Sequence, residues 1–268
     1  MNYLQSHSVV HPDAKIGKDV TIGPFTCIEK DVVIGDGTWI GPNVTIFDGA
    51  RIGKNCKIFP GAVIAGVPQD LKFQGELTTA EIGDNTIDRE YVTVNRGTSY
   101  AAKTKVGNNC LLMAYVHVAH DCILGDHVIL ANNVNLAGHV EIEDWAILEG
   151  LVAVQQFTKI GQHAFIAGAS LVRKNVPPFI KAAREPLAYA GVNSIGLRRR
   201  NFDEGVIKEI HDIYRILFVR GYNISNALEE IENTIAPSAE RETILSFIRA
   251  AEGGIVRGFH KVNGSSVY

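Results

Sequence analysis

Aliphatic residues recur at every sixth position along most of the chain. Steps of six from Val10 to Val172 pass through 28 positions, and 24 of them are Ile, Leu or Val. An α-helix would repeat about every 3.6 residues and a simple strand about every 2. A period of six therefore predicts short strands joined by turns, three to a coil, wound into a parallel β-helix around a ladder of aliphatic side chains.

Three six-residue units make a coil of 18 residues, so residues 18 apart are expected to stack at roughly 4.8 Å, the spacing of neighbouring strands. The positions that break the pattern are Asp70, Glu76, Asp88 and Tyr100. All but Asp88 fall in two polar stretches, which we expect to form loops extruded near residues 67–81 and 98–105. Loops on a rigid scaffold are where binding groups tend to lie.

The repeat stops near "NVPPFI", because the two prolines cannot continue a hydrogen-bonded ladder. The apolar spacing then becomes helical, with Asp203 as the expected N-cap of the first helix and Ser225 and Ser238 as the expected caps of two more. The sequence thus predicts an all-β domain over residues 1–185 and a small α-helical domain over residues 186–268.

Composition narrows the class of protein. The 268 residues carry a formal net charge of -3, without an excess of basic residues that would suggest a nucleic-acid partner. The chain lacks an apolar run long enough for a membrane span, and its first residues do not resemble a signal peptide, so we expect a cytoplasmic protein without stable membrane insertion. The four cysteines form no C-x-x-C pair, and packing explains them better than redox chemistry.

Candidate chemistry gathers around "HVAHD". The 18-residue register places two columns side by side, with His120, Gly138 and Gln156 in one and Asp121, His139 and Phe157 in the other. His117 lies on the same turn region, three residues before His120. A His, an acid and a second His are thus expected to meet within three successive coils.

Three interpretations of this cluster remain open on the residues alone. A metal site needs three or more converging ligands. An acid–base site needs an imidazole and a carboxylate that selects its tautomer, and the backbone N–H of Gly138 would then be free to bind an oxyanion. The third interpretation is that the polar residues simply line solvated turns.

The ordered motifs of the whole chain resemble one family. The six-residue repeat, "GVPQDLKF", "HVAHD", "LAGHV", "QQF" and "GVNSIGLRRRNF" closely resemble the UDP-N-acetylglucosamine acyltransferases, from about residue 8 to the C-terminus. The resemblance implies a left-handed parallel β-helix with a C-terminal helical domain, assembled as a homotrimer with active sites between subunits. The handedness comes from the resemblance alone, since crossover connections are generally right-handed.

The resemblance also implies a reaction, the first step of lipid A synthesis. An (R)-3-hydroxyacyl chain moves from acyl carrier protein to the glucosamine 3-hydroxyl of UDP-N-acetylglucosamine (UDP-GlcNAc). His120 matches the general base, Asp121 the acid that orients it, and Gly138 the oxyanion donor. No metal, other cofactor or covalent enzyme intermediate is implied, because the acyl group arrives on the phosphopantetheine of the carrier protein.

Further positions match substrate contacts of the family. The sugar and acyl contacts are Gln69, Asp70, Lys72, His117, His139 and Gln156; the uridine and diphosphate contacts are Asn193, Arg199 and Arg200. Gly168 matches the position that limits acyl length, and the lack of a side chain there predicts a long acyl chain. Gln155 and Ile195 depart from residues common in the family, so some sugar and nucleotide contacts must differ.

Late basic residues are expected to attract the acidic carrier protein, although each of them other than Arg199 and Arg200 is also explained as ordinary solvated surface. They are Arg173, Lys174, Lys181, Arg184, Arg198, Arg199 and Arg200. The competing functions are a metal-dependent hydratase, a sugar acetyltransferase that uses acetyl-CoA, and a non-catalytic scaffold. The exact acyl chain, and whether the acceptor carries a 3-hydroxyl or a 3-amino group, are not determined by the sequence.

Overall fold

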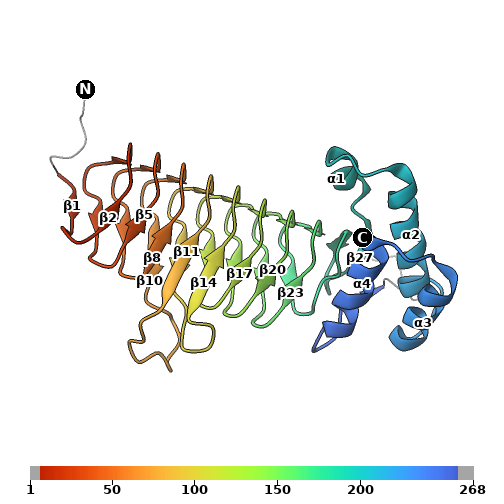
Figure 1. The fold of residues 1–268 in the computed structure, drawn as a ribbon. Coiled ribbons are helices and arrows are strands. Elements are labelled where there is room, and N and C mark those ends of the chain that lie inside the picture. Colours follow the sequence, from red (N-terminus) through yellow and green to blue (C-terminus); the bar gives the residue numbers. More distant parts are fainter. Residues whose placement is uncertain (1–6, 259–268) are drawn as a thin grey trace.

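The computed structural model describes residues 7–258. Its larger part is a prism of three parallel sheets, in which each coil contributes one strand to each sheet (Figure 1). Sheet A contains β1 (Val9–Val10), β4 (Cys27–Ile28), β7 (Thr45–Ile46), β10 (Val63–Gly66), β13 (Thr93–Asn95), β16 (His117–Val118), β19 (Asn135–Leu136), β22 (Ala153–Val154) and β25 (Leu171–Val172). Sheet B contains β2 (Lys15–Ile16), β5 (Val33–Ile34), β8 (Ala50–Ile52), β11 (Thr79–Ile82), β14 (Lys103–Val106), β17 (Ile123–Leu124), β20 (Glu141–Ile142) and β23 (Lys159–Ile160).

Sheet C completes the prism and runs on into the C-terminal region. Its strands are β3 (Thr21–Ile22), β6 (Trp39–Ile40), β9 (Lys57–Ile58), β12 (Ile87–Asp88), β15 (Leu111–Leu112), β18 (Ile129–Leu130), β21 (Ile147–Leu148), β24 (Phe165–Ile166), β26 (Ile180–Ala183), β27 (Ala188–Val192) and β28 (Arg257–Gly258). The turns between the sheets form three edges of the prism, which we call the A–B, B–C and C–A corners.

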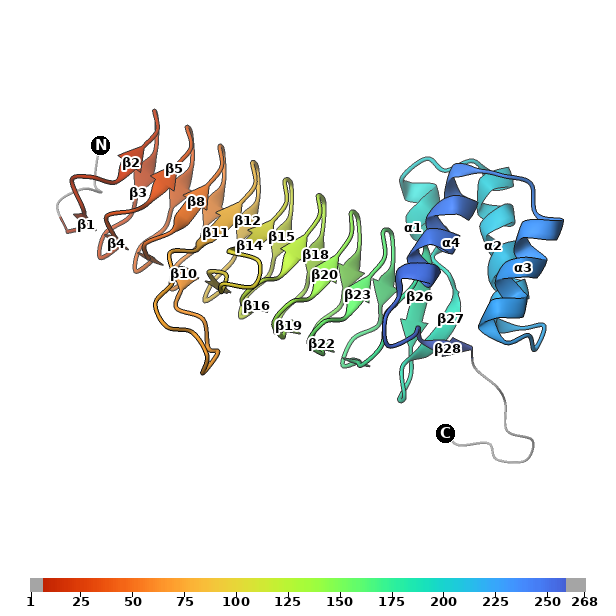
Figure 2. The same ribbon diagram turned by 60° about the horizontal axis from the view of Figure 1, so that its bottom comes forward.

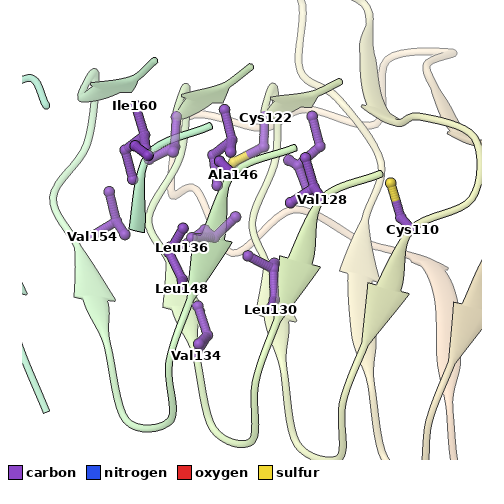
Figure 3. Packing of buried hydrophobic residues seen from close by; sticks show 14 of the residues in the cluster. Cys110, Cys122, Val128, Leu130, Val134, Leu136, Ala146, Leu148, Val154 and Ile160 are labelled. Carbon is purple, nitrogen blue, oxygen red and sulfur yellow. The ribbon is translucent and has the colours of Figure 1, made fainter. Parts of the chain in front are cut away.

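The predicted register is confirmed. His117 pairs with Asn135, and Asn135 pairs with Ala153, in steps of 18 residues. The aliphatic positions point inward and pack as a continuous ladder; Figure 3 shows Leu130, Leu148 and their neighbours in this interior. Full burial of each Leu or Ile contributes about 1.5–3 kcal/mol, so the repeat itself supplies the core of the fold.

Two loops project from the same side of the prism (Figure 1). The first loop, residues 67–78, joins β10 to β11, and the second loop, residues 96–102, joins β13 to β14. Both are shorter than the stretches expected from polarity, because Thr79 and Lys103 already pair with each other as strand residues. Polar residues on the outer face of a strand cannot be distinguished from loop residues by composition alone.

The helices cover the C-terminal end of the prism (Figure 2). β26 and β27 form an antiparallel hairpin, and the expected domain boundary at residue 185 lies in its turn. The helices are α1 (Ser194–Arg199), α2 (Glu204–Phe218), α3 (Ile224–Thr234) and α4 (Ala239–Ala250). Within the described range, no helix combines the length and the apolar character needed to cross a bilayer.

Helix capping confirms two of the three expected N-caps. Asp203 caps α2 and Ser238 caps α4, each through its side-chain oxygen. The expectation for Ser225 was wrong, because Asn223 begins α3 by accepting a hydrogen bond from the Asn226 backbone N–H at 2.8 Å. Asn and Ser are both strong N-caps, so the sequence alone does not decide between Asn223 and Ser225.

Candidate active site

His120 and Asp121 lie side by side at the A–B corner, in the turn between β16 and β17. Nδ1 of His120 is 2.8 Å from Oδ2 of Asp121, and the two side chains are 10 % and 0 % exposed. Because a carboxylate only accepts, the ring proton is assigned to Nδ1, which leaves the lone pair on Nε2. This is the arrangement of a general base held by an acid.

Asp121 is held by donors from the second loop. Its Oδ1 accepts from the N–H groups of Thr98 and Ala101, at 2.9 Å and 3.2 Å, and its Oδ2 accepts from the Thr98 hydroxyl at 2.7 Å. Burial raises the pKa of this carboxyl, but the hydrogen bonds from Thr98, His120 and Ala101 outweigh burial and hold the pKa of Asp121 below its ordinary value. Asp121 is therefore a carboxylate at neutral pH.

Gly138 lies one coil beyond His120, and a side chain at this position would displace the His120 ring. A Cβ atom on Gly138 would be 2.6 Å from Cε1 and 2.8 Å from Nε2 of the His120 ring. Among the hydrogen bonds of the described residues, none is donated by the Gly138 N–H. The glycine thus gives the base room and leaves a backbone donor beside it, as an oxyanion site requires.

His139 occupies the corner position one coil beyond Asp121. Its ring stacks on Phe157, with centroids 4.4 Å apart, and meets the edge of Tyr100 from the second loop. Burial lowers the pKa of His139 against the opposing attraction of Asp121. Its Nδ1 is buried without a hydrogen-bond partner among the described residues, so this neutral ring still has a polar atom to offer a ligand.

Three side chains of this cluster are also of the kinds that bind metal ions. The ligand atoms of His120, Asp121 and His139 all lie within 4.8 Å of one another. However, Oδ2 of Asp121 already accepts from Thr98 and His120, so an ion bound between the three residues would have to break the hydrogen bond that joins the acid to the base. The geometry suits proton transfer better than metal ligation, and the predicted lack of a metal cofactor stays a prediction.

A cavity of about 810 Å³ opens beside this cluster. Asp121, His139 and Gln156 line it together with Arg173 and Lys174, whereas His120 and Gly138 are not among the described residues that line it. The C-terminal segment contributes Glu252, Gly253 and Gly254 to its wall. The cavity thus passes the acid of the acid–base pair and two basic residues, and it is large enough for an extended ligand with an anionic end.

The other residues predicted near the sugar lie around this corner. His117 projects from β16, and its Nδ1 is 2.7 Å from the Thr93 hydroxyl; burial, and then the neighbouring His120, lower the pKa of His117. Asp70, from the first loop, lies near enough to His139 to influence the pKa of that ring. Gln69 and Lys72 are exposed on the same loop.

The residues predicted to bind uridine and diphosphate lie at a different corner. Arg200 donates from Nη2 to the backbone oxygen of Trp145 at 3.1 Å and lies over its ring. Asn193 caps α1 and donates to the backbone oxygen of His163 at 2.9 Å. Since Trp145 and His163 occupy the B–C corner, one chain does not bring these residues to His120.

Two further predicted residues complete this map. Arg199, at the end of α1, is exposed. Gly168 lies at the C–A corner, where an added Cβ would approach the backbone oxygen of Gly150 to 3.3 Å. The predicted site residues are therefore spread over three corners of a single chain.

Sequence reasoning missed Thr98 and Ala101, which hold the acid. The second loop lengthens its coil from 18 to 24 residues, as the pairing of Thr93 with His117 shows. A fixed 18-residue register therefore could not place loop residues beside Asp121. The available signal was a threonine, a side chain able to donate to a carboxylate, in a polar insertion.

Family models and curated relatives identify the family of this chain. The model for bacterial transferase hexapeptide (six repeats) matches residues 31–66 and 103–138, and that for UDP-N-acetylglucosamine O-acyltransferase, domain 2, matches residues 175–256. An acyl-[acyl-carrier-protein]–UDP-N-acetylglucosamine O-acyltransferase of Thiobacillus denitrificans is 41 % identical over 96 % of this chain and 100 % of the relative. One from Xanthomonas oryzae is 46 % identical over 93 % and 96 %.

Solved structures match as well. The UDP-N-acetylglucosamine acyltransferase of Bacteroides fragilis superimposes with a TM-score of 0.94 at 49 % identity, covering 95 % of this chain and 100 % of that one. The Francisella novicida enzyme gives 0.92 at 42 %, covering 95 % and 94 %. The fold and the repeat define a hexapeptide-repeat transferase, a left-handed parallel β-helix followed by helices. Within that class, the chain belongs to the UDP-N-acetylglucosamine O-acyltransferase family.

Proposed function

We propose that this protein transfers an (R)-3-hydroxyacyl group from acyl carrier protein to the glucosamine 3-hydroxyl of UDP-GlcNAc. The observation that carries the proposal is the His120–Asp121 pair beside the free amide of Gly138, with Asp121 lining an adjacent cavity of about 810 Å³, in a member of this family. The relatives are named for transfer from acyl carrier protein to UDP-GlcNAc, which supports both substrates.

In the proposed reaction, these groups act in turn. Nε2 of His120 accepts the proton of the 3-hydroxyl as its oxygen attacks the thioester carbonyl carbon. The carbonyl oxygen becomes an oxyanion and accepts a hydrogen bond from the Gly138 N–H. The carbon–sulfur bond then breaks, and the leaving thiolate takes the proton from His120, which yields an ester and a free phosphopantetheine thiol. A positioned base contributes about 10²–10⁴-fold and an oxyanion donor about 10²–10³-fold.

The cysteines support direct transfer without an acyl-enzyme. Burial raises the pKa of Cys56 to about 11 and that of Cys110 and Cys122 to about 12. Thiols with such values carry almost no thiolate at neutral pH, so they are poor nucleophiles. Cys27 is the exposed one, and it lies on β4, far along the prism from β16.

The homotrimer is part of the proposal. In one chain, Asn193 and Arg200 lie at the B–C corner, whereas His120 lies at the A–B corner. A second copy that brings its B–C corner against the A–B corner of the first would complete the site for a nucleotide sugar. Light scattering that gives a monomer under assay conditions would contradict this assembly.

Acyl carrier protein is proposed to approach the cavity where Arg173 and Lys174 line it. Part of the expected basic patch is neutralised, since Arg173 pairs with Glu185 and Arg198 pairs with Glu204. Lys174 lines the cavity itself. Basic groups around an entrance raise the encounter rate with an acidic partner, and this effect falls with ionic strength.

The test is a direct assay with UDP-GlcNAc and a mixture of 3-hydroxyacyl carrier proteins, with mass spectrometry of the product. We expect an O-acylated nucleotide sugar with a long chain, because Gly168, which matches the family position that limits acyl length, has no side chain. The 3-amino analogue and acetyl-CoA are included as alternative acceptor and donor. Turnover with acetyl-CoA alone, or normal turnover by His120→Ala, would contradict the proposal.

A further inference from the structure

We propose that Thr98 is a positioning residue of the active site, whose hydroxyl and amide hold the Asp121 carboxylate so that the His120 Nε2 lone pair stays directed to the Gly138 side. The kinetic part of this inference rests on the proposed function. The structural part does not, because it concerns only the surroundings of one carboxylate. Thr98 reaches the base through Asp121 and is not itself placed against the substrate.

Asp121 accepts two hydrogen bonds on each oxygen. Oδ1 takes the N–H groups of Thr98 and Ala101, and Oδ2 takes the Thr98 hydroxyl and Nδ1 of His120. A carboxylate offers about four lone-pair sites, so all of them are used. Two of the four donors belong to Thr98, and this residue therefore determines the plane in which the carboxylate faces His120.

The second loop is built to keep Thr98 in place. Gly97 admits no side chain, because a Cβ there would lie 2.3 Å from the Lys103 backbone nitrogen. The Thr78 hydroxyl donates to the Gly97 oxygen at 2.6 Å, and the Ala102 N–H donates to the Thr98 oxygen at 2.8 Å. Thr98 itself is 7 % exposed. The loop is thus a compact turn whose donors converge on Asp121.

Removing the Thr98 hydroxyl should raise the pKa of Asp121. The Thr98 hydroxyl is one of the groups that lower the pKa of Asp121. Without it, Oδ2 keeps Nδ1 of His120 at 2.8 Å and Nε2 of His139 at 3.9 Å, and the carboxylate stabilises positive charge on these imidazoles more strongly. Proton abstraction from the substrate should then require a higher pH. The carboxylate also loses one of the contacts that fix its rotation.

The first variant is Thr98→Val, which keeps the branched shape and loses the hydroxyl. We expect kcat to fall about 10–10²-fold, as for a slightly misplaced catalytic group, with KM changed less than about 2-fold. The acidic limb of the pH profile of kcat should move up by about half to one pH unit. Thr98→Ser, which restores the hydroxyl, should recover most of the activity and the original profile.

Thr78→Val is the matched control. Thr78 is also a buried threonine whose hydroxyl holds the second loop, but it donates to Gly97 and does not contact Asp121. We expect its pH profile to coincide with that of the parent protein. A profile shifted as far as that of Thr98→Val, or a Thr98→Val protein with unchanged kcat and profile, would overturn the inference.

A titration separates this inference from the proposed function. Carbon NMR of the Asp121 carboxyl needs no substrate, and Thr98→Val should raise the pKa of Asp121 by about one unit. A shifted titration in a protein without acyltransferase activity would contradict the proposed function and support the positioning role. An unshifted titration in an active enzyme would overturn the positioning role alone.

Discussion

Two aspartates lie inside the β-helix with opposite surroundings. Asp121, at the A–B corner, accepts four hydrogen bonds, and its pKa is held below the ordinary value. Asp88, on β12, is 0 % exposed, and neither of its oxygens has a hydrogen-bond partner among the described residues. Burial raises the pKa of Asp88 to about 7.

The contrast shows that hydrogen-bond donors, and not burial, decide which form of a carboxyl group this scaffold stabilises. Asp88 stands in the interior ladder, paired in register with Ile58 and Leu112. The titratable groups that interact electrostatically with Asp88 are the thiols of Cys56 and Cys110, and burial keeps both thiols protonated. An interior position therefore favours a neutral acid, whereas a corner next to a loop can hold an anion.

The largest expected effect on activity comes from changing Asp121, the aspartate at the A–B corner. Asp121→Asn replaces an acceptor by an amide that donates, so the His120 ring is no longer held with its proton on Nδ1. We expect kcat to fall about 10³–10⁴-fold, as when a triad loses its acid, with little change in KM. Steady-state assays measure this, with Asp88→Asn as the control expected to stay within about 3-fold. A loss smaller than about 10-fold would argue against the assigned pair.

The next largest effect is on the free energy of unfolding, and it comes from Asp88 in the core. Because the folded pKa of Asp88 is about 7 and the unfolded value is near 4, the folded state binds the extra proton between these pH values. The free energy of unfolding therefore falls as pH rises from about 4 to 7, by about 1.4 kcal/mol per unit and up to about 4 kcal/mol in all.

Asp88→Val should remove this dependence. We expect the variant to gain stability over the parent protein most strongly at pH 7 and above, and least at pH 4 to 5. Denaturant unfolding at several pH values measures the difference. The carboxyl of Asp121 has the opposite sign, since its lowered pKa adds stability that is lost only as pH falls through the folded value. A difference between Asp88→Val and parent that does not grow with pH would refute a neutral, buried Asp88.

Glycine at the corner gives a smaller effect on activity. Gly138→Ala places a methyl group against the His120 ring, so the base must move while the acid stays. We expect about a 10²-fold loss in kcat. Gly150→Ala is the matched control, because the nearest atom to its added Cβ is 3.4 Å away. Equal losses in both variants would show that the substitution acts through the coil and not through the base.

The fold could be predicted from the sequence because the six-residue period is strict. Ile46, Ile64 and Leu130 mark the interior without any reference to tertiary structure, and the same register placed His120 beside Gly138. Asp88 was recognised only as an exception to the repeat. Its isolation inside the ladder depends on which side chains surround it, and periodicity does not report that.

The site could be predicted less well from the sequence where an inserted loop or a second copy of the chain contributes residues. Thr98 reaches Asp121 from an inserted loop, so no fixed spacing links the two residues. Arg200 lies over Trp145 because α1 folds back onto the B–C corner, a contact between segments 55 residues apart. The roles assigned to Gln69, Lys72, Asn193 and Arg199 stay predictions, since the first two are exposed on the first loop and the last two lie away from the base in one chain.

The smallest expected effect separates the backbone of Asp121 from its carboxylate. The Thr104 hydroxyl, which is 0 % exposed, accepts the Asp121 N–H at 2.8 Å and does not contact the acid itself. Thr104→Val leaves that N–H without an acceptor, so we expect a loss of about 1–3 kcal/mol in the free energy of unfolding. Because the four donors to the carboxylate remain, kcat should stay within about 3-fold and the pH profile should not move. A shifted profile in this variant would mean that the backbone of the turn, and not the donors on its carboxylate, sets the properties of the acid.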